Sequence, residues 1–308
     1  MKKGCIFLIS ARKRLLRECL FLLDKNYNNK FHYPILIFYH GKLYDDYKFR
    51  ESIRSINRKV EYRFHKLKAK IPSNIKKKDL FWNLENPYAK RFKGRIGYLH
   101  ANYFWNNFMN FSHLMEFNYL MRIDDDSWFK GKIEIDLFEE LDRNKGLFGS
   151  AYLWENSSER AMNTRINLFN WTKEYIKKKA IKVKDKKLRE SLNGDVDNLL
   201  FHSLKWNSGN CNIYNRKMFE TDSWREFNNE FNKIAGGYRY RWGDCEILGI
   251  YSYIFLDPPI INFNLKSKGL YESQLPSTKF VLSIREEIIQ RVKNKIKSFL
   301  KILILFFD

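Results

Sequence analysis

Cysteine, proline and glycine are all scarce in this chain of 308 residues, which contains four, six and 14 of them. The cysteines have no CxxC spacing and no histidine at zinc-ligand spacing, which argues against a zinc site. Sequence alone leaves a disulfide open, but buried free thiols are the expectation for a chain this long. The glycine-rich patterns GxGxxG and GxxxxGK are absent, which argues against dinucleotide-binding dehydrogenases and P-loop enzymes.

Long apolar runs are also missing. No apolar stretch reaches the roughly 20 residues that a membrane-spanning helix needs. Residues 1–4 lead directly into the strand-like segment "CIFLIS", and no secretory signal precedes it. These absences predict a cytoplasmic or peripheral membrane protein.

Positive charge is abundant. Lys and Arg number 57 against 35 Asp and Glu, so the formal net charge is +22. A balance this basic favours polyanionic partners, namely nucleic acid, an anionic membrane surface or phosphorylated small molecules. A general Lys- and Asn-rich composition explains the charge equally well. Hydrophobic residues make up 44% of the chain, enough for a folded core.

The first seventy residues alternate between strand and helix patterns. Short apolar runs over residues 5–10 and 33–41 predict buried strands, and residues 59–67 alternate as a half-exposed strand does. Residues 11–27 have helical apolar spacing. This order predicts an α/β fold with a mostly parallel central sheet.

Further elements follow along the chain. Residues 68–94 are Lys-rich and contain prolines, and they read as an excursion or mobile loop. The pattern predicts helices over 97–117 and, with a loop as the alternative, 173–190, and strands over 119–123, 146–154, 210–219 and 253–263.

The stretch "YLMRIDDDSWF" carries the clearest chemical signal. An apolar strand ends in Asp124, Asp125 and Asp126, whose ionised carboxylates repel each other and resist burial. Strand geometry places Asp124 and Asp126 on one side and Asp125 on the other. Paired hard oxygen ligands at the carboxyl end of a strand suit Mn²⁺ or Mg²⁺ carrying a diphosphate. By itself an Asp-x-Asp pattern is a weak signal, and a second pair at 195 and 197 reads as turn chemistry.

Two other segments add candidate residues. Asp244 follows "AGGYRYRWG", whose aromatic residues suit stacking on sugars or bases, and it would serve an acceptor hydroxyl or act as a helix N-cap. "SARKR" comes just after the first strand, so Ser10 and Arg12 are placed to meet the base or phosphates of a nucleotide.

Four segments resemble the glycolipid α-1,2-mannosyltransferases of the fungal Golgi. They occur in the family's order and are "NKFHYPILIFYHGKLY", "RIGYLHANYFWNNF", "YLMRIDDDSWF" and "AGGYRYRWGDCEILGIYSYIFLD". The resemblance implies a glycosyltransferase A fold, a GDP-mannose donor, Mn²⁺, and transfer with retention of configuration. It also implies a glycan or glycoconjugate acceptor.

The resemblance assigns roles at four positions. Asp124 matches the Glu and Asp126 the Asp of the family's Glu-Pro-Asp variant of the metal motif. Asp125, which lies between them, is a separate candidate for contact with the donor. Tyr98 matches an active-site tyrosine, and Asp244 matches the acid of the Arg-Trp-Gly-Asp motif.

At two further positions the chain departs from the family. The proposed nucleophilic Glu falls at Asn212, and an amide cannot form a glycosyl ester. The family's metal-binding His has no counterpart, because no His follows His202, and the nearest oxygen donors are Tyr271 and Glu272. These departures weaken two of the expectations, namely that the sugar is mannose and that transfer retains the configuration.

The sequence therefore predicts a metal-dependent hexosyltransferase with a single catalytic domain over residues 1–278. Residues 279–308 predict a basic amphipathic helix, which would lie on an anionic membrane or pack on the catalytic domain. Other functions considered are transfer from a UDP-sugar, metal-dependent nucleotidyl transfer, and nucleic-acid binding, which no recognition motif supports.

Overall fold

A computed structural model describes residues 3–42, 44–68, 70–85, 87–155, 162–163, 165–193 and 199–273. Two predictions lie outside these residues, namely the turn pair at 195 and 197 and the basic helix over 279–308. The predicted domain boundary after residue 278 lies there too. The chain forms a first compact unit through Glu272.

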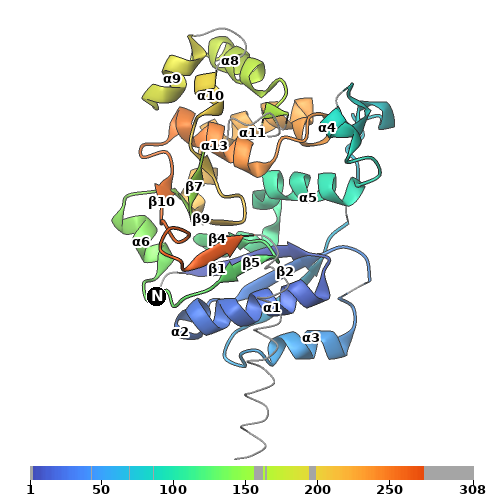
Figure 1. The fold of residues 1–308 in the computed structure, drawn as a ribbon, viewed down its shortest axis with the longest axis vertical. Helices are drawn as coiled ribbons and strands as arrows, with labels where there is room; N and C mark the ends of the chain where they lie inside the picture. Colours follow the sequence, from blue (N-terminus) through green and yellow to red (C-terminus); the bar gives the residue numbers. More distant parts are fainter. Residues whose placement is uncertain are drawn as a thin grey trace, which may run out of the picture. The chain divides into compact units, whose positions relative to one another are not determined.

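A seven-stranded sheet forms the centre of this unit, in the order β10-β6-β9-β4-β1-β2-β3 (Figure 1). Every neighbouring pair is parallel except those made by β9, which runs against β4 and β6. The predicted α/β fold with a mostly parallel sheet is confirmed. The strands are β1 (Gly4–Ser10), β2 (Ile35–Tyr39), β3 (Tyr62–Lys66), β4 (Tyr119–Ile123), β6 (Phe148–Ser150), β9 (Cys211–Asn215) and β10 (Ile261–Asn262).

Two small two-stranded sheets flank the central one. In one of them β5 (Ser127–Phe129) pairs with β11 (Tyr271–Ser273), and in the other β7 (Leu153–Trp154) pairs with β8 (Trp206–Asn207). Only the three aspartates separate β5 from β4. The sheet of β5 and β11 therefore fixes the chain directly beyond the three aspartates.

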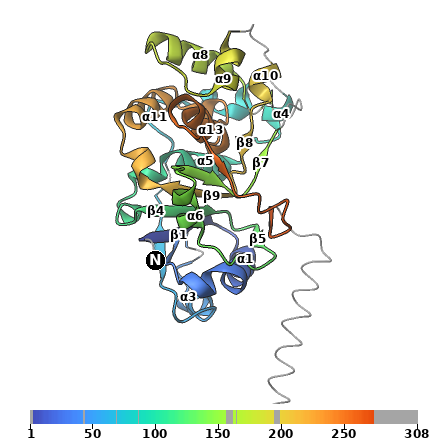
Figure 2. The same ribbon diagram turned by 90° about the vertical axis from the view of Figure 1, so that its left-hand side faces the viewer.

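Helices cover both faces of the central sheet, as both views show (Figures 1 and 2). On one face lie α1 and α3, and on the other lie α5, α11 and α13. The α-helices are α1 (Lys13–Leu23), α2 (Asn29–Phe31), α3 (Tyr47–Arg54), α4 (Pro87–Lys90), α5 (Ile96–Asn107), α6 (Leu137–Arg143), α8 (Leu168–Lys178), α9 (Lys186–Leu192), α10 (Leu199–His202), α11 (Asp222–Ile234), α12 (Gly236–Arg239) and α13 (Asp244–Phe255).

Two parallel strands of the sheet are buried on both faces. In β1 every residue but Ile9 is buried, and all five residues of β2 are. Helix α1 turns six apolar residues, spaced by helical periodicity, towards this sheet. Continuous apolar runs and one amphipathic helix are the pattern expected when helices pack on both faces of a parallel sheet.

The structure corrects several of the predicted elements. The strand predicted over 210–219 ends at Asn215 and is followed by a 3₁₀ helix, Arg216–Phe219. The helix predicted over 97–117 ends at Asn107 and continues as two 3₁₀ turns, Phe108–Asn110 and Ser112–Leu114. The strand predicted over 146–154 is divided into β6 and β7. Most of the strand predicted over 253–263 is absent, because residues 253–255 belong to α13. Ten of the twelve residues of α13 are buried, so its sequence lacks the polar face that marks a helix.

The Lys-rich segment after β3, predicted as an excursion or mobile loop, contains short helices. It includes α4 and two 3₁₀ turns, Lys77–Asp79 and Phe81–Asn83. All four cysteines are free, as expected. Within the described parts of the chain, no helix is long and apolar enough to cross a bilayer.

Candidate functional site

The three aspartates follow β4 at the carboxyl edge of the sheet. Strand β1 ends at the same edge, because it is parallel to β4, and β9 begins there, because it is antiparallel. The site therefore gathers residues from the ends of β1 and β4 and from the start of β9. This edge is where open α/β sheets bind ligands.

Asp124 is held from both sides. Its Oδ1 accepts a hydrogen bond of 3.0 Å from Arg122 Nη2, and its Oδ2 accepts one of 3.2 Å from Asn210 Nδ2. Its backbone N–H donates to the carbonyl of Asn210 at 2.8 Å. A quarter of the side chain is exposed, so the carboxylate is fixed in direction but still reachable from solvent.

Arg122 is a site residue that sequence reasoning missed. Arg122 belongs to β4, and its side chain is buried. Its guanidinium lies 3.8 Å from the centre of the Trp105 ring. It forms an ion pair with Asp124 and a second one with Asp244. One buried cation therefore joins the first aspartate after β4 to the first residue of α13.

Asp125 points into the protein. Its Oδ2 accepts hydrogen bonds from Ser10 Oγ at 2.6 Å and from Arg12 Nε at 3.2 Å, and its Oδ1 pairs with Arg12 Nη2. The same Nη2 donates to Asp126 Oδ2 at 3.0 Å. Asp125 is buried, whereas Arg12 is 47% exposed, so Asp125 anchors a cation that faces solvent.

The surroundings raise the pKa values of Asp124, Asp125 and Asp244. Loss of water around Asp124 raises the pKa of its carboxyl to about 7, with further increases from Asp126 and Asp244, although Arg122 acts in the opposite direction. Burial also raises the pKa values of Asp125 and Asp244. A divalent cation would offset the repulsion between these carboxylates.

The oxygen donors fit a metal site that a ligand completes. Asp124 and Asp126 are both partly exposed, and the charge of Asp126 contributes to the raised pKa of Asp124. Among the described residues, no group of three or more His, Cys, Asp or Glu side chains could hold a metal ion. Mn²⁺ and Mg²⁺ commonly take one or two carboxylates and complete their shell with water and phosphate oxygens, which suits this pair.

Glu272 and Asn212 are placed differently from the three aspartates. Glu272 Oε1 lies 3.2 Å from Lys266 Nζ in an ion pair. Asn212 is fully buried, and its Nδ2 donates to Asn207 Oδ1 at 3.0 Å.

Tyr98 lies on α5 and contacts the segment that leads to Asp244. Its hydroxyl accepts a hydrogen bond from Arg241, whose guanidinium lies 5.0 Å from the centre of the Tyr98 ring. Arg241 has a positive φ of 63°, which is uncommon for a residue with a side chain. Gly243 is the N-cap of α13, so Asp244 is the first residue of that helix instead of its cap.

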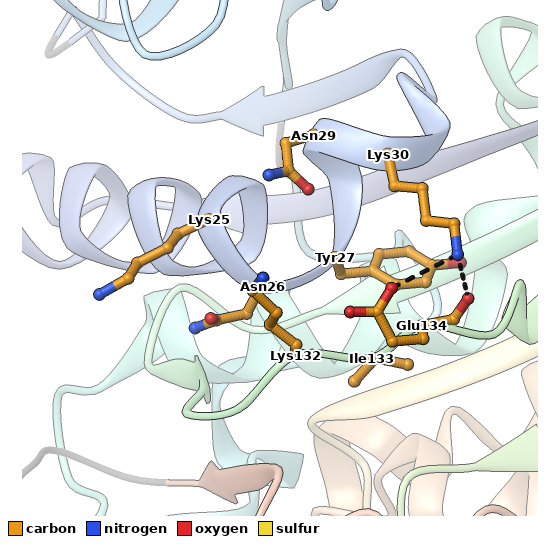
Figure 3. A pocket seen from close by; sticks show the side chains of 8 residues that line it. All are labelled: Lys25, Asn26, Tyr27, Asn29, Lys30, Lys132, Ile133 and Glu134. Carbon is orange, nitrogen blue, oxygen red and sulfur yellow. Dashed lines mark hydrogen bonds and ion pairs between the residues drawn. The ribbon is translucent and has the colours of Figure 1, made fainter.

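A cavity of about 230 Å³ lies elsewhere, where α1 continues as a π-helix (Asp24–Asn28). Figure 3 shows its side chains, with Lys30 reaching the side chain and the backbone carbonyl of Glu134. Arg12 precedes α1 and this cavity follows it, so the length of the helix, roughly 16 Å, separates them. None of the residues predicted for the site lines it. Its lining residues are Lys25, Asn26, Tyr27, Asn29, Lys30, Lys132, Ile133 and Glu134.

Comparisons with known proteins identify similar sequences and similar folds. The family model described as glycolipid 2-alpha-mannosyltransferase matches residues 2–287. A curated relative, the probable mannosyltransferase KTR3 of Saccharomyces cerevisiae, is 26% identical over 250 residues. That alignment covers 78% of this chain and 59% of the relative, so the chain spans less than two thirds of the relative's length.

Solved structures share the fold. The mannosyltransferase Ktr4p from S. cerevisiae superposes with a TM-score of 0.69 at 18% identity, over 85% of this chain and 68% of that one. Core-mannan synthase A from Aspergillus fumigatus, in its Mn/GDP form, also gives a TM-score of 0.69, at 16% identity over 85% and 73% of the two chains.

Proposed function

Because the chain belongs to the glycolipid 2-alpha-mannosyltransferase family, we propose that it transfers mannose from GDP-mannose to a hydroxyl of a glycan or glycoconjugate, with retention of configuration. The observation that carries this proposal is the cluster at the carboxyl edge of the sheet, where Asp126 pairs with the half-exposed cation Arg12 and Asp124 pairs with the buried cation Arg122. Two acids and a cation suit a diphosphate bound with a divalent ion. The GDP in a relative's Mn/GDP form supports the choice of nucleotide.

Asp124 and Asp126 are the proposed metal ligands. Bound Mn²⁺ or Mg²⁺ would neutralise charge on the diphosphate leaving group as a Lewis acid. Arg122 and Asn210 hold Asp124 in direction, and Arg12 holds Asp126. Glu272 is proposed as a further oxygen ligand by its position in β11, beside β5.

Ser10, Arg12 and Asp125 are proposed to meet the donor. The Arg12 guanidinium is fixed by Asp125 through two nitrogens and remains half exposed, so it is preorganised to contact a phosphate or a base. Ser10 orients Asp125 through the 2.6 Å hydrogen bond.

Asp244 is proposed to orient or deprotonate the acceptor hydroxyl. In the proposed reaction the bond from the sugar carbon to the diphosphate breaks, and the acceptor oxygen bonds to the same face of that carbon. The hydroxyl proton goes to Asp244 or to the departing diphosphate. Front-face transfer is consistent with Asn212, which cannot act as a carboxylate nucleophile. Tyr98 contributes a partly exposed ring to the acceptor side.

Residues 1–278 are proposed to act as one catalytic domain, and residues 279–308 as an added basic helix. A peripheral contact with an anionic membrane fits the charge of +22 and a membrane-held acceptor. We propose this membrane contact, and we propose that Asp124 and Asp126 form an Asp-x-Asp metal motif.

Ligand-dependent thermal protection tests the proposed donor. GDP-mannose with Mn²⁺ should raise the melting temperature, because a ligand that binds only the folded chain stabilises it by mass action. Protection without metal should be much weaker. A UDP-sugar that protects better would change the donor, and protection by single-stranded nucleic acid alone, independent of metal, would reject the enzyme assignment.

A further inference from the structure

The segment between β3 and α5 carries a dense array of exposed positive charge. Nine of the 28 residues from 68 to 95 are Lys or Arg, against 57 of 308 in the whole chain, and only two are acidic. The overall Lys-rich composition therefore does not account for this density. All nine side chains are exposed, and they are Lys68, Lys70, Lys76, Lys77, Lys78, Lys90, Arg91, Lys93 and Arg95.

This segment, called here the basic outcrop, is built on a small core of its own. Its apolar residues pack against α5 and α12, and α4 lies beside α5 in Figure 1. Asp79 pairs with Arg239 at 3.7 Å, and Asn74 Nδ2 donates to the carbonyl of Lys233 at 3.5 Å. Apolar side chains are therefore turned inwards, and the cations are presented outwards. The core residues are Ile75, Leu80, Phe81, Tyr88, Ala89, Leu99, Ala235 and Tyr238.

No cation of the basic outcrop forms an ion pair with a carboxylate in the described parts of the chain. Elsewhere on the surface such pairs are common, for example between Lys66 and Asp45 at 2.7 Å and between Lys179 and Glu226 at 2.6 Å. Like charges that are not neutralised repel each other, so this arrangement does not stabilise the folded chain. An external anion would neutralise them.

The composition of the basic outcrop selects among anionic partners. Seven of its nine cations are Lys, which acts as a point charge, whereas nucleic-acid and phosphate recognition favours the planar fork of Arg. Single-stranded nucleic acid also binds through exposed aromatic side chains. The four aromatic side chains of the outcrop all pack on its core instead: Phe81 and Tyr88 are buried, and Trp82 and Phe92 are partly buried. A diffuse anionic surface matches scattered, exposed lysines best.

We infer that the basic outcrop docks the protein on an anionic lipid bilayer. The outcrop is tied to the site, because the Arg241 guanidinium lies 4.9 Å from the centre of the Phe92 ring in the outcrop and 5.0 Å from that of Tyr98. Arg241 stands three residues before Asp244. Docking would therefore bring the acceptor side of the site to a membrane-held acceptor, a consequence that rests on the proposed function.

Vesicle binding by the full chain tests the docking. Phosphatidylcholine vesicles with and without 30% phosphatidylserine would be sedimented with the wild type and with Lys77→Glu/Lys78→Glu/Lys93→Glu. The matched control is Lys177→Glu/Lys178→Glu/Lys182→Glu, which changes three exposed lysines outside the outcrop. Each triple variant lowers the net charge by six, so any difference between them reports position instead of total charge.

The wild type should bind only the anionic vesicles, and the outcrop variant should lose roughly 100-fold or more in affinity, at about fivefold per lysine. The control should lose less than about tenfold. A Gln version of the outcrop variant repeats the test by neutralisation in case Glu perturbs the fold. Equal losses in both variants, no binding by the wild type, or outcrop-dependent preference for RNA over vesicles would overturn the inference. The assay contains no donor, so its result is independent of the proposed transfer.

Discussion

At the scale of single residues, the three aspartates have separate partners and should respond differently to substitution. Asp126→Asn should abolish Mn²⁺-dependent protection by the donor. It should change the stability of the ligand-free protein by less than about 0.5 kcal/mol, because this partly exposed carboxylate sits among like charges. Melting curves with and without Mn²⁺ and GDP-mannose measure both. Wild-type protection in this variant would contradict the metal assignment.

Asp125→Asn is the matched comparison. Asp125 is buried and accepts from Ser10 and Arg12, so removing its charge should destabilise the ligand-free protein by about 1–3 kcal/mol. Urea unfolding of the two variants should therefore rank Asp125→Asn as less stable and Asp126→Asn as the one that fails to bind metal. The reverse ranking would mean that the two roles are exchanged.

Arg122 gives the largest predicted effect on stability. Arg122→Met leaves Asp124 and Asp244 without their shared cation and should cost about 3–5 kcal/mol. Arg122→Lys retains the charge but not the fork, and it should recover part of that loss.

The double variant Arg122→Met/Asp244→Asn provides the control for this prediction. If the loss comes from unpaired carboxylates, the two substitutions together should cost less than the sum of the separate effects in denaturant unfolding. Strict additivity would show that Arg122 acts through packing on Trp105 instead.

At the scale of elements, the turn before α13 depends on one glycine. A Cβ on Gly236 would overlap the ring of Trp242, whose Nε1 donates to the carbonyl of Ile166 at 2.8 Å. Gly236→Ala should destabilise the protein by about 1–3 kcal/mol and lower the turnover, because Trp242 stands two residues before Asp244.

The adjacent glycine is the control. A Cβ on Gly237 would find its nearest neighbours at 3.5 Å, an ordinary contact distance. Gly237→Ala should therefore be neutral or slightly stabilising in the same thermal melts, since Ala favours helix over Gly. Equal destabilisation by the two substitutions would show that glycine is needed for backbone freedom throughout the turn.

The elements also show how far sequence reasoning reaches. The strand before Asp124 was predictable, because an apolar run ends abruptly in acids. The position of Arg122 was not, since "YLMRI" reads as an apolar strand and the partner Asp244 lies 122 residues away. A lone Arg in a buried strand was the only local signal. Helix α13 was read in part as a strand because burial on all sides removes its periodicity.

At the scale of the whole molecule, His65 should make stability depend on pH. Burial, followed by the charges of His113 and Arg63, lowers the pKa of His65 to about 4, and its ring lies 3.9 Å from that of His113. An unfolded histidine takes up a proton near pH 6.5. The folded chain therefore loses stability as the pH falls from about 6.5 towards 4, because the unfolded state binds the proton first.

Comparison with His65→Gln isolates this contribution. The variant has no proton to bind at this position, so its unfolding free energy should fall less steeply between pH 6.5 and 4 than that of the wild type. Urea titrations at half-unit pH steps measure the two slopes. Parallel curves would show that His65 is solvated like a free histidine.

The antiparallel strand β9 sets the order in which the molecule can be completed. On the ribosome, β1, β2, β3 and β4 emerge first, but β4 leaves one edge unpaired until residues 211–215 are made. Arg122 acquires its second carboxylate partner later still, because Asp244 is synthesised 29 residues after the end of β9. A nascent chain that ends before residue 211 exposes the open edge of β4 and is therefore prone to aggregate. A chain that ends before Asp244 leaves Arg122 with Asp124 as its carboxylate partner and without the second one. The last third of the chain is therefore needed to avoid aggregation during folding as well as to complete the site.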